Sequence, residues 1–166
     1  MQVFAKAFAA LLLALSLSGC AQKFIDYDGP EVTRLVINKS ERQLYLLNGD
    51  TVLKSYGVDL GFNPVGHKQF EGDGRTPEGS YVIDRRNPNS AYYLSIGISY
   101  PNPDDIAYAR KMGKDPGGDI FIHGGPTRWR DKGKPDWTAG CISVSNKEIR
   151  EIYAMVRNGT PIDIYP

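Results

Sequence analysis

Two residues of this 166-residue chain have the types and spacing that nucleophilic catalysis needs. Cys141 follows two small residues and precedes a β-branched run, and His123 comes directly after the apolar run 119–122 and before two glycines. A thiol attacks as the thiolate, and an imidazole within hydrogen-bond reach can remove its proton and later return it to a leaving amine. The sequence therefore predicts Cys141 as nucleophile and His123 as proton acceptor and donor.

The residues beside Cys141 leave room for a substrate carbonyl. Ala139 and Gly140 precede the thiol, so the backbone N–H groups of Gly140 and Cys141 are predicted donors to a developing oxyanion. If His123 and Cys141 end neighbouring strands of one sheet, thiol and imidazole meet beneath the intervening loop. The alternatives are a buried, inert core cysteine and a turn histidine without a catalytic role.

The first twenty residues predict export. Lys6 precedes an apolar run, 7–17, that is too short to span a bilayer, and small residues lead to Cys20. Residues 1–19 resemble a bacterial lipoprotein signal peptide, after which Cys20 is lipidated; a plain signal peptide that holds a cysteine is the alternative. Residues 20–30 are then a tether and 31–166 the catalytic domain.

A lipidated Cys20 predicts where the domain lies and whether its surroundings are oxidising. The domain would face the periplasm at the cell envelope, and Ala21, which stands where some lipoproteins retained at the inner membrane carry Asp, favours the outer membrane. With Cys20 acylated, Cys141 is the only thiol left in an oxidising compartment. It is then either a buried, inert residue or a reactive group.

Composition excludes several classes of function. Twenty Lys and Arg against 19 Asp and Glu give a net charge of +1, which provides no basic field for nucleic acid. Two histidines without closely spaced ligand pairs predict no metal site and no cofactor. His67 lies in a loop rich in Gly and Pro, and we expect it to be solvated.

The remaining elements are short. A mostly β domain, sandwich-like, with one or two short helices is predicted. Strands are expected at 32–38, 42–48, 51–60, 80–85, 92–98, 119–122, 138–145 and 160–166. One helix is expected from Asp104, as N-cap, to Met112. A second begins at Ser145, where Ser145 and Glu148 form a capping box, and ends at Asn158-Gly159.

Together these motifs resemble a known family. Ile122-His123-Gly124, followed by Thr138-Ala139-Gly140-Cys141-Ile142 and preceded by the segment 72–81, is similar to the signature of the L,D-transpeptidase (YkuD) catalytic domain. The resemblance covers roughly 32–166. It implies a Cys nucleophile, a His base and a thioester formed with the tetrapeptide stem of peptidoglycan. It also implies oxyanion or substrate-binding positions at Gly124, Thr138, Gly140 and Ser143.

Two positions depart from the family pattern. Many members carry a second His where this chain has Ala139, and Arg where it has Ser143. Three functions therefore stay open: transfer of the acyl group to an amine of the wall or of an envelope protein, hydrolysis of the intermediate as some relatives do, and an inactive wall-binding lipoprotein.

The loop between the two predicted catalytic residues is cationic and aromatic. It is either a solvated charged loop or a lid whose cations meet the carboxylates of a stem peptide. Tyr92 and Tyr93 either line the groove or belong to the core. The loop residues concerned are Arg128, Trp129, Arg130, Lys132, Lys134 and Trp137.

Overall fold

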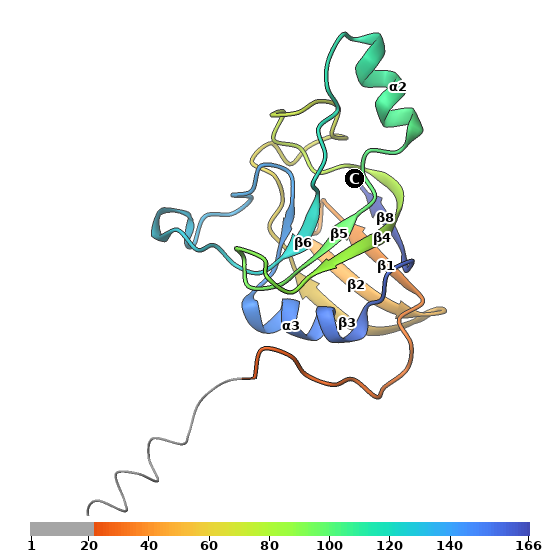
Figure 1. Ribbon diagram of the computed structural model, residues 1–166, viewed down its shortest axis with the longest axis vertical. Coiled ribbons are helices and arrows are strands. Elements are labelled where there is room, and N and C mark those ends of the chain that lie inside the picture. Colours follow the sequence, from red (N-terminus) through yellow and green to blue (C-terminus); the bar gives the residue numbers. More distant parts are fainter. Residues whose placement is uncertain (1–21) are drawn as a thin grey trace, which may run out of the picture.

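The computed structural model describes residues 22–166. One sheet of eight strands, in the order β3-β2-β1-β8-β4-β5-β6-β7, curls into a half-barrel (Figure 1). The mostly β prediction with two helices is confirmed. The strands are β1 (Arg34–Asn38), β2 (Gln43–Asn48), β3 (Thr51–Gly57), β4 (Gly79–Asn87), β5 (Ser95–Ile98), β6 (Phe121–His123), β7 (Ile142–Ser143) and β8 (Pro161–Tyr165).

Two parallel pairs set the topology. The strands β1, β2 and β3 form an antiparallel meander, and β8 returns from the end of the chain to lie parallel to β1 and antiparallel to β4. At the other end, β6 pairs antiparallel with β5 and parallel with β7. The parallel β6–β7 pair needs a long crossover, and residues 124–141 supply it.

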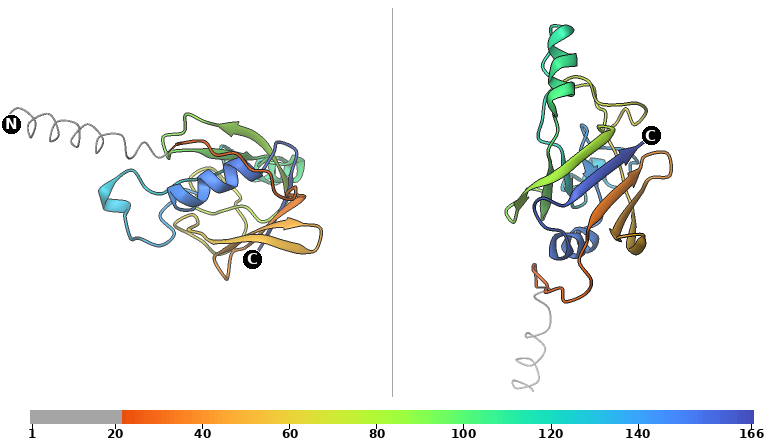
Figure 2. Two further views of the ribbon diagram at one scale, coloured as in Figure 1. Left: turned by 90° about the horizontal axis from the view of Figure 1, so that it is seen from below. Right: turned by 90° about the vertical axis from the view of Figure 1, so that its right-hand side faces the viewer.

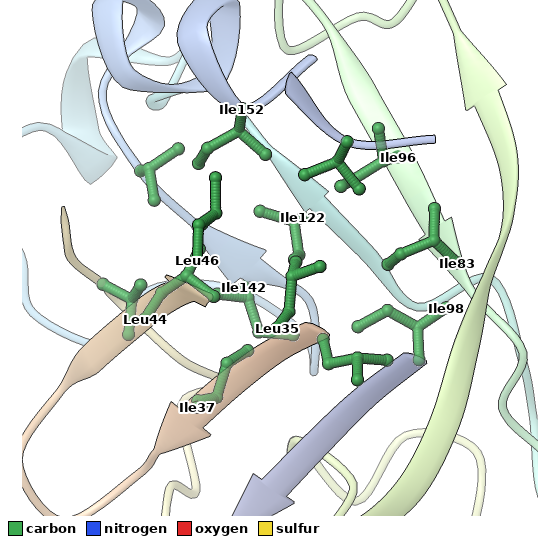
Figure 3. Packing of buried hydrophobic residues seen from close by; sticks show 14 of the residues in the cluster. Leu35, Ile37, Leu44, Leu46, Ile83, Ile96, Ile98, Ile122, Ile142 and Ile152 are labelled. Atoms are coloured by element: carbon green, nitrogen blue, oxygen red, sulfur yellow. The ribbon is translucent and has the colours of Figure 1, made fainter. Parts of the chain in front are cut away.

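The core lies inside the curl. Isoleucines and leucines from both arms of the sheet and from helix α3 (Asn146–Met155) point toward one another (Figure 3). Leu35, Leu46, Ile96, Ile122 and Ile142 are all fully buried, and each such side chain contributes roughly 1.5–3 kcal/mol of hydrophobic stabilisation. Because side chains alternate along a strand, burying Ile122 and Ile142 turns their neighbours His123, Cys141 and Ser143 to the opposite face.

Helix α3 closes the curl, as the views from below and from the side show (Figure 2). The predicted capping box is present: the Ser145 hydroxyl accepts from the Glu148 N–H at 3.2 Å, and the Glu148 carboxylate accepts from the Ser145 N–H at 2.8 Å. The helix ends at Met155, before the predicted Asn158-Gly159, because Val156 is already extended and buried.

The N-cap of helix α2 (Pro103–Lys111) lies two residues before the predicted one. Its N-cap is Asn102, whose side chain accepts from the N–H groups of Asp104 and Asp105, so the assignment of Asp104 as N-cap was wrong. Pro103 fits the first helical position because no intrahelical partner is available there for an N–H.

Three predicted strands are shorter than expected by three residues or more. The strand expected at 92–98 starts at Ser95, since Tyr93 has a φ of 75°, and the one expected at 51–60 ends at Gly57. The strand expected at 138–145 is reduced to Ile142–Ser143, because Gly140, with a φ of 138°, makes the preceding residues a tight turn.

The described N-terminal residues 22–30 are irregular and lie against α3 (Figure 1). Lys23 donates to the Pro88 carbonyl at 2.7 Å, and Phe24 packs on Tyr153 with ring centroids 6.1 Å apart. The predicted signal peptide and Cys20 lie outside the described residues. Within 22–166, neither helix has the length and apolar composition for a membrane crossing.

Candidate active site

The parallel β6–β7 pair brings the two predicted catalytic residues to one face. Ile122 is opposite Ile142 and His123 is opposite Ser143. Cys141 directly precedes Ile142, so it lies one step along the same face, diagonal to His123. His123 is the last residue of β6, and Cys141 directly precedes β7, the strand that pairs with it.

The imidazole of His123 is buried and oriented by the backbone. Its Nδ1 is 2.7 Å from the carbonyl oxygen of Gly124, and the Ser143 hydroxyl donates to the same oxygen at 3.3 Å. A carbonyl can only accept, so Nδ1 carries the proton and Nε2 is left with its lone pair. Burial lowers the pKa of His123, and the Gly124 carbonyl partly opposes that shift. The ring is therefore neutral at pH 7.

Two aromatic rings hold the imidazole. The Tyr92 ring stacks on it with centroids 4.3 Å apart and planes at 24°, and the Trp137 ring meets it edge-on at 5.6 Å. Tyr92 thus lies at the candidate site. Of the two alternatives for this residue, the groove and the core, the contact with His123 favours the groove. The Trp137 Nε1 is buried and has no acceptor among the residues that the structure describes.

The thiol of Cys141 is half-buried and protonated. Its Sγ donates to the Asp119 carbonyl at 3.5 Å. Burial raises the pKa of the Cys141 thiol; the Phe121 backbone N–H and the Lys68 ammonium oppose the rise, and the Asp119 carboxylate adds to it. With the pKa of His123 lowered, both shifts favour a neutral thiol and a neutral imidazole over a preformed ion pair. The proton must then move during attack.

The turn before Cys141 is held by Thr138. Its hydroxyl donates to the Cys141 carbonyl at 2.6 Å and accepts from the Gly140 N–H at 3.2 Å. Thr138 is buried, so its hydroxyl is engaged in shaping the turn. Among the described residues the Gly140 N–H is thus engaged, whereas the Cys141 N–H has no hydrogen-bond partner.

A glycine-rich loop packs backbone to backbone on this turn. Gly61 bridges to Thr138, and the Phe62 N–H donates to the Thr138 carbonyl at 2.8 Å. A Cβ on Gly140 would lie 2.7 Å from the Arg75 carbonyl oxygen, so only glycine fits there. The segment 72–81, noted in the sequence as part of the family pattern, therefore supports the turn that leads to Cys141 through the backbone of Arg75.

Asp73 organises that loop, and sequence reasoning missed it. Its carboxylate accepts from the N–H groups of Gln69, Phe70 and Arg75 at 2.7–3.0 Å and from the Lys68 ammonium at 2.9 Å. Burial alone would raise the pKa of Asp73, but these donors hold it below its ordinary value. An Asp next to Gly, as here, is a turn signal, yet nothing in the sequence indicates which amides it accepts from.

The expectation of a solvated His67 was wrong. The Glu78 N–H donates to its Nδ1 at 2.9 Å, so Nε2 carries the proton and donates to Asp105 at 2.9 Å. Tyr81 donates to the other Asp105 oxygen at 3.0 Å. His67 is a structural residue that joins the loop 61–79 to helix α2.

The loop 125–137 carries cations at its tip and is fixed at its base. Trp129 is 84% exposed within the short helix η1 (Trp129–Asp131), and the four predicted lid cations are exposed beside it. At the base, the Asp136 carboxylate accepts from Arg42 at 2.7 Å and from the Leu60 N–H at 3.0 Å. This anchor positions Trp137 against His123.

Comparison with known proteins identifies the family of the chain. A family model described as the L,D-transpeptidase catalytic domain, YkuD, matches residues 32–164. The chain is 34% identical over 143 residues to YafK of Escherichia coli (strain K12), whose name places it among the L,D-transpeptidases; the match covers 78% of this chain and 52% of that protein. The chain thus spans about half the length of this curated relative.

Solved structures share the fold. A mutant form of Pgp2, a helical cell shape determining protein from Campylobacter jejuni, aligns with a TM-score of 0.62 at 26% identity, covering 90% of this chain and 52% of that one. Bd1075 from Bdellovibrio bacteriovorus aligns with a TM-score of 0.56 at 24% identity, covering 86% and 50%.

Proposed function

Because the chain belongs to the L,D-transpeptidase catalytic domain family, we propose that it is a cysteine-dependent acyltransferase acting on peptidoglycan stem peptides. The observation that carries this proposal is the β6–β7 pair, which sets Cys141 and His123 on one face with the Gly124 carbonyl at Nδ1. A nucleophile, a base and a group that orients the base would thereby come from His123 and from residues at the ends of two adjacent strands.

The reaction follows from the protonation states. Sγ attacks the amide carbon of the stem as its proton passes to Nε2 of His123, and the Cys141 N–H faces the oxyanion. The imidazolium then gives its proton to the departing amine, which leaves a thioester. In the second half, an acceptor amine attacks the thioester, gives its proton to the imidazole, and the thiolate leaves and recovers that proton.

Groups around the pair are suited to bind an acidic peptide. The loop 125–137 carries four exposed cations, and the carboxylates of a stem peptide are complementary to them in charge. These cations are Arg128, Arg130, Lys132 and Lys134. The buried Trp137 Nε1 lacks an acceptor among the residues of known placement, and a carbonyl of the bound stem would provide one.

The proposal includes the setting. We infer that Cys20 is lipidated and that the domain faces the periplasm, held at the outer membrane. From there it would reach wall peptides, with an amine of the wall or of an envelope protein as acceptor. Pgp2, which has a similar structure, is described as a helical cell shape determining protein. The proposal therefore includes an effect of this acyl transfer on cell shape.

Mass spectrometry of the intact protein tests the proposal. Incubation with a tetrapeptide muropeptide should add the mass of the acyl fragment to the wild-type chain and none to Cys141→Ala. His123→Ala should slow acylation by roughly 10²–10⁴-fold. Arg110→Gln, an exposed change on α2, is the control. An acylated Cys141→Ala, or an inert wild type whose fold is intact by circular dichroism, would refute the assignment; the latter result would favour a wall-binding protein.

Incubation with purified sacculi separates transfer from hydrolysis. Both need the same pair and differ in the second nucleophile. New cross-linked dimers indicate transfer to an amine. Released tripeptides, or a released envelope protein, without dimers would replace the acyltransferase proposal with a hydrolase.

A further inference from the structure

A second site lies on the far side of helix α3 from the sheet. The described N-terminal segment crosses α3 there (Figure 1), and a cavity of about 240 Å³ opens between them. The segment contributes Phe24, Ile25, Asp26 and Tyr27 to its lining. The domain contributes Arg86 of β4, then Arg150, Tyr153 and Ala154 of α3, and Arg157.

Three guanidinium groups border this cavity. The ion pairs of the described residues include none of the three. The Arg150 Nε is buried and has no acceptor within 22–166, while its Nη1 donates to the Gln22 carbonyl at 3.3 Å. An uncommitted donor buried beside a cavity is costly unless a ligand or water occupies it.

Hydrogen bonds to backbone carbonyls at the end of α3 use only some of the N–H donors of these arginines. Arg86 donates to the Val156 and Tyr153 carbonyls at 2.9 and 2.5 Å, and Arg157 donates to the Ala154 carbonyl at 3.1 Å. These bonds suit cations near a helix C-terminus. Since each guanidinium has five N–H donors, most of the donors remain free.

The net charge and the number of donors define the ligand. Asp26 is the carboxylate in the lining, so three positive charges face one negative. Guanidinium groups reach the cavity from β4, from α3 and from Arg157, two residues after the end of α3. A carboxylate has two oxygens to offer, whereas the phosphodiester of a lipid headgroup has two charged oxygens and two ester oxygens. The glyceryl and acyl groups of a lipid can also contact Phe24 and Ile25 of the lining, which neither a carboxylate ion nor inorganic phosphate can do.

We propose that this cavity binds a phosphate group, carried by a lipid headgroup of the membrane next to the N-terminal segment. The choice of a lipid rests on the proposed lipidation of Cys20, because Phe24 is four residues from it and a chain of that length spans at most about 14 Å. A bound headgroup joins the segment to α3, so it fixes how the catalytic domain stands on the membrane.

Binding is measured on the full chain carrying Cys141→Ala, so that catalysis plays no part. The probes are short-chain dihexanoyl phosphatidylglycerol, inorganic phosphate and acetate, added to protein in a phosphate-free nonionic detergent. The readout is the shift of arginine Nε–H signals in ¹H–¹⁵N spectra. We expect saturable shifts with the phosphatidylglycerol at Arg150, weaker ones with inorganic phosphate, and none with acetate.

Variants make the test specific. Arg150→Gln and Arg157→Gln should each weaken binding about tenfold, from the loss of charge-assisted hydrogen bonds. Asp26→Asn should strengthen it several-fold, because it removes the one opposing charge. Arg110→Gln on α2 carries the same charge change away from the cavity and should have no effect. Circular dichroism checks that each variant is folded.

Several results would overturn the inference. Absence of saturable binding by either phosphate probe, equal binding of acetate, or equal weakening by Arg110→Gln each removes the phosphate site. If inorganic phosphate binds as tightly as the phosphatidylglycerol, the headgroup assignment falls. None of these results depends on Cys141 chemistry, so they are separate from failure of the acylation test.

Discussion

Gly61→Ala is the substitution that tests the support of the nucleophile most directly. A Cβ at this position would clash with the Gly74 carbonyl oxygen and would lie 2.9 Å from its carbon and 3.0 Å from the Gly140 Cα. All of these atoms belong to the backbone, so no side-chain rotation relieves the contact. The two segments on either side of Gly61 must move apart, and one of them leads directly into Cys141.

The Gly61→Ala substitution should lower both the free energy of unfolding and the rate of acylation. Overpacking of a well-packed site lowers the free energy of unfolding by about 1–3 kcal/mol, which at a urea m-value of about 2 kcal/mol/M shifts the midpoint by about 0.5–1.5 M. Movement of Gly140 also displaces the thiol and the Cys141 N–H. A misplacement of about 1 Å reduces the rate by about 10²-fold, so acylation should fall more than stability alone explains.

Gly57→Ala is the matched control. It adds the same methyl group at a glycine of β3 where a Cβ would have nothing within 4 Å, and we expect it to be neutral or stabilising by up to about 1 kcal/mol. Urea unfolding gives the stability of both variants, and the rate of acyl addition by mass gives their activity. Equal midpoints and equal rates for the two would refute the argument that backbone contact holds the turn.

Three further predictions follow from named groups. Since burial lowers the pKa of His123, kcat/KM should stay level as the pH is lowered to below 6.5. Since burial raises the pKa of Cys141, the rate of iodoacetamide labelling should increase with pH to beyond about 8.5. Full labelling at pH 6 would contradict the neutral thiol and imidazole. The pKa of Asp73 is held down in the fold, so its stabilisation is present above about pH 3.9 and is lost as pH falls through the native value; urea unfolding should show Asp73→Asn less stable at pH 7, with the difference shrinking below pH 4. Ser145→Ala should cost about 0.5–2 kcal/mol of unfolding free energy, whereas exposed Ser55→Ala should cost almost nothing; equal losses would remove the capping argument.

The fold was predictable where the pattern is local. The capping box at Ser145 and the antiparallel pair around Lys39 are determined by neighbouring residues, and both are present. The ends of elements were less predictable, because tertiary contacts decide them. Val156, for example, leaves α3 to enter the core, so the helix stops before the glycine that the sequence marks as its end.

The sequence predicts the two candidate reactive residues, and it does not predict the groups that surround them. Cys141 and His123 stand out because few other residues of the chain could carry the chemistry. The groups that hold them are backbone carbonyls, such as those of Gly124 and Asp119, which every residue has and no pattern marks. Tyr92 reaches the imidazole from the segment before β5, and that contact depends on the curl of the whole sheet.

Ser143 shows how a departure from a family pattern can be understood from the structure. Where many members have Arg, this chain has a buried serine whose hydroxyl donates to the Gly124 carbonyl, the same oxygen that accepts from Nδ1 of His123. A carbonyl oxygen has two lone pairs, so both donors can be satisfied at once and the oxygen is fixed from two sides. The serine therefore stabilises the group that orients the base, and its presence is consistent with an intact Cys–His pair. What the chain lacks at this position is a cation, and the cations of the loop 125–137 are the nearest replacement in sequence for binding an acidic substrate.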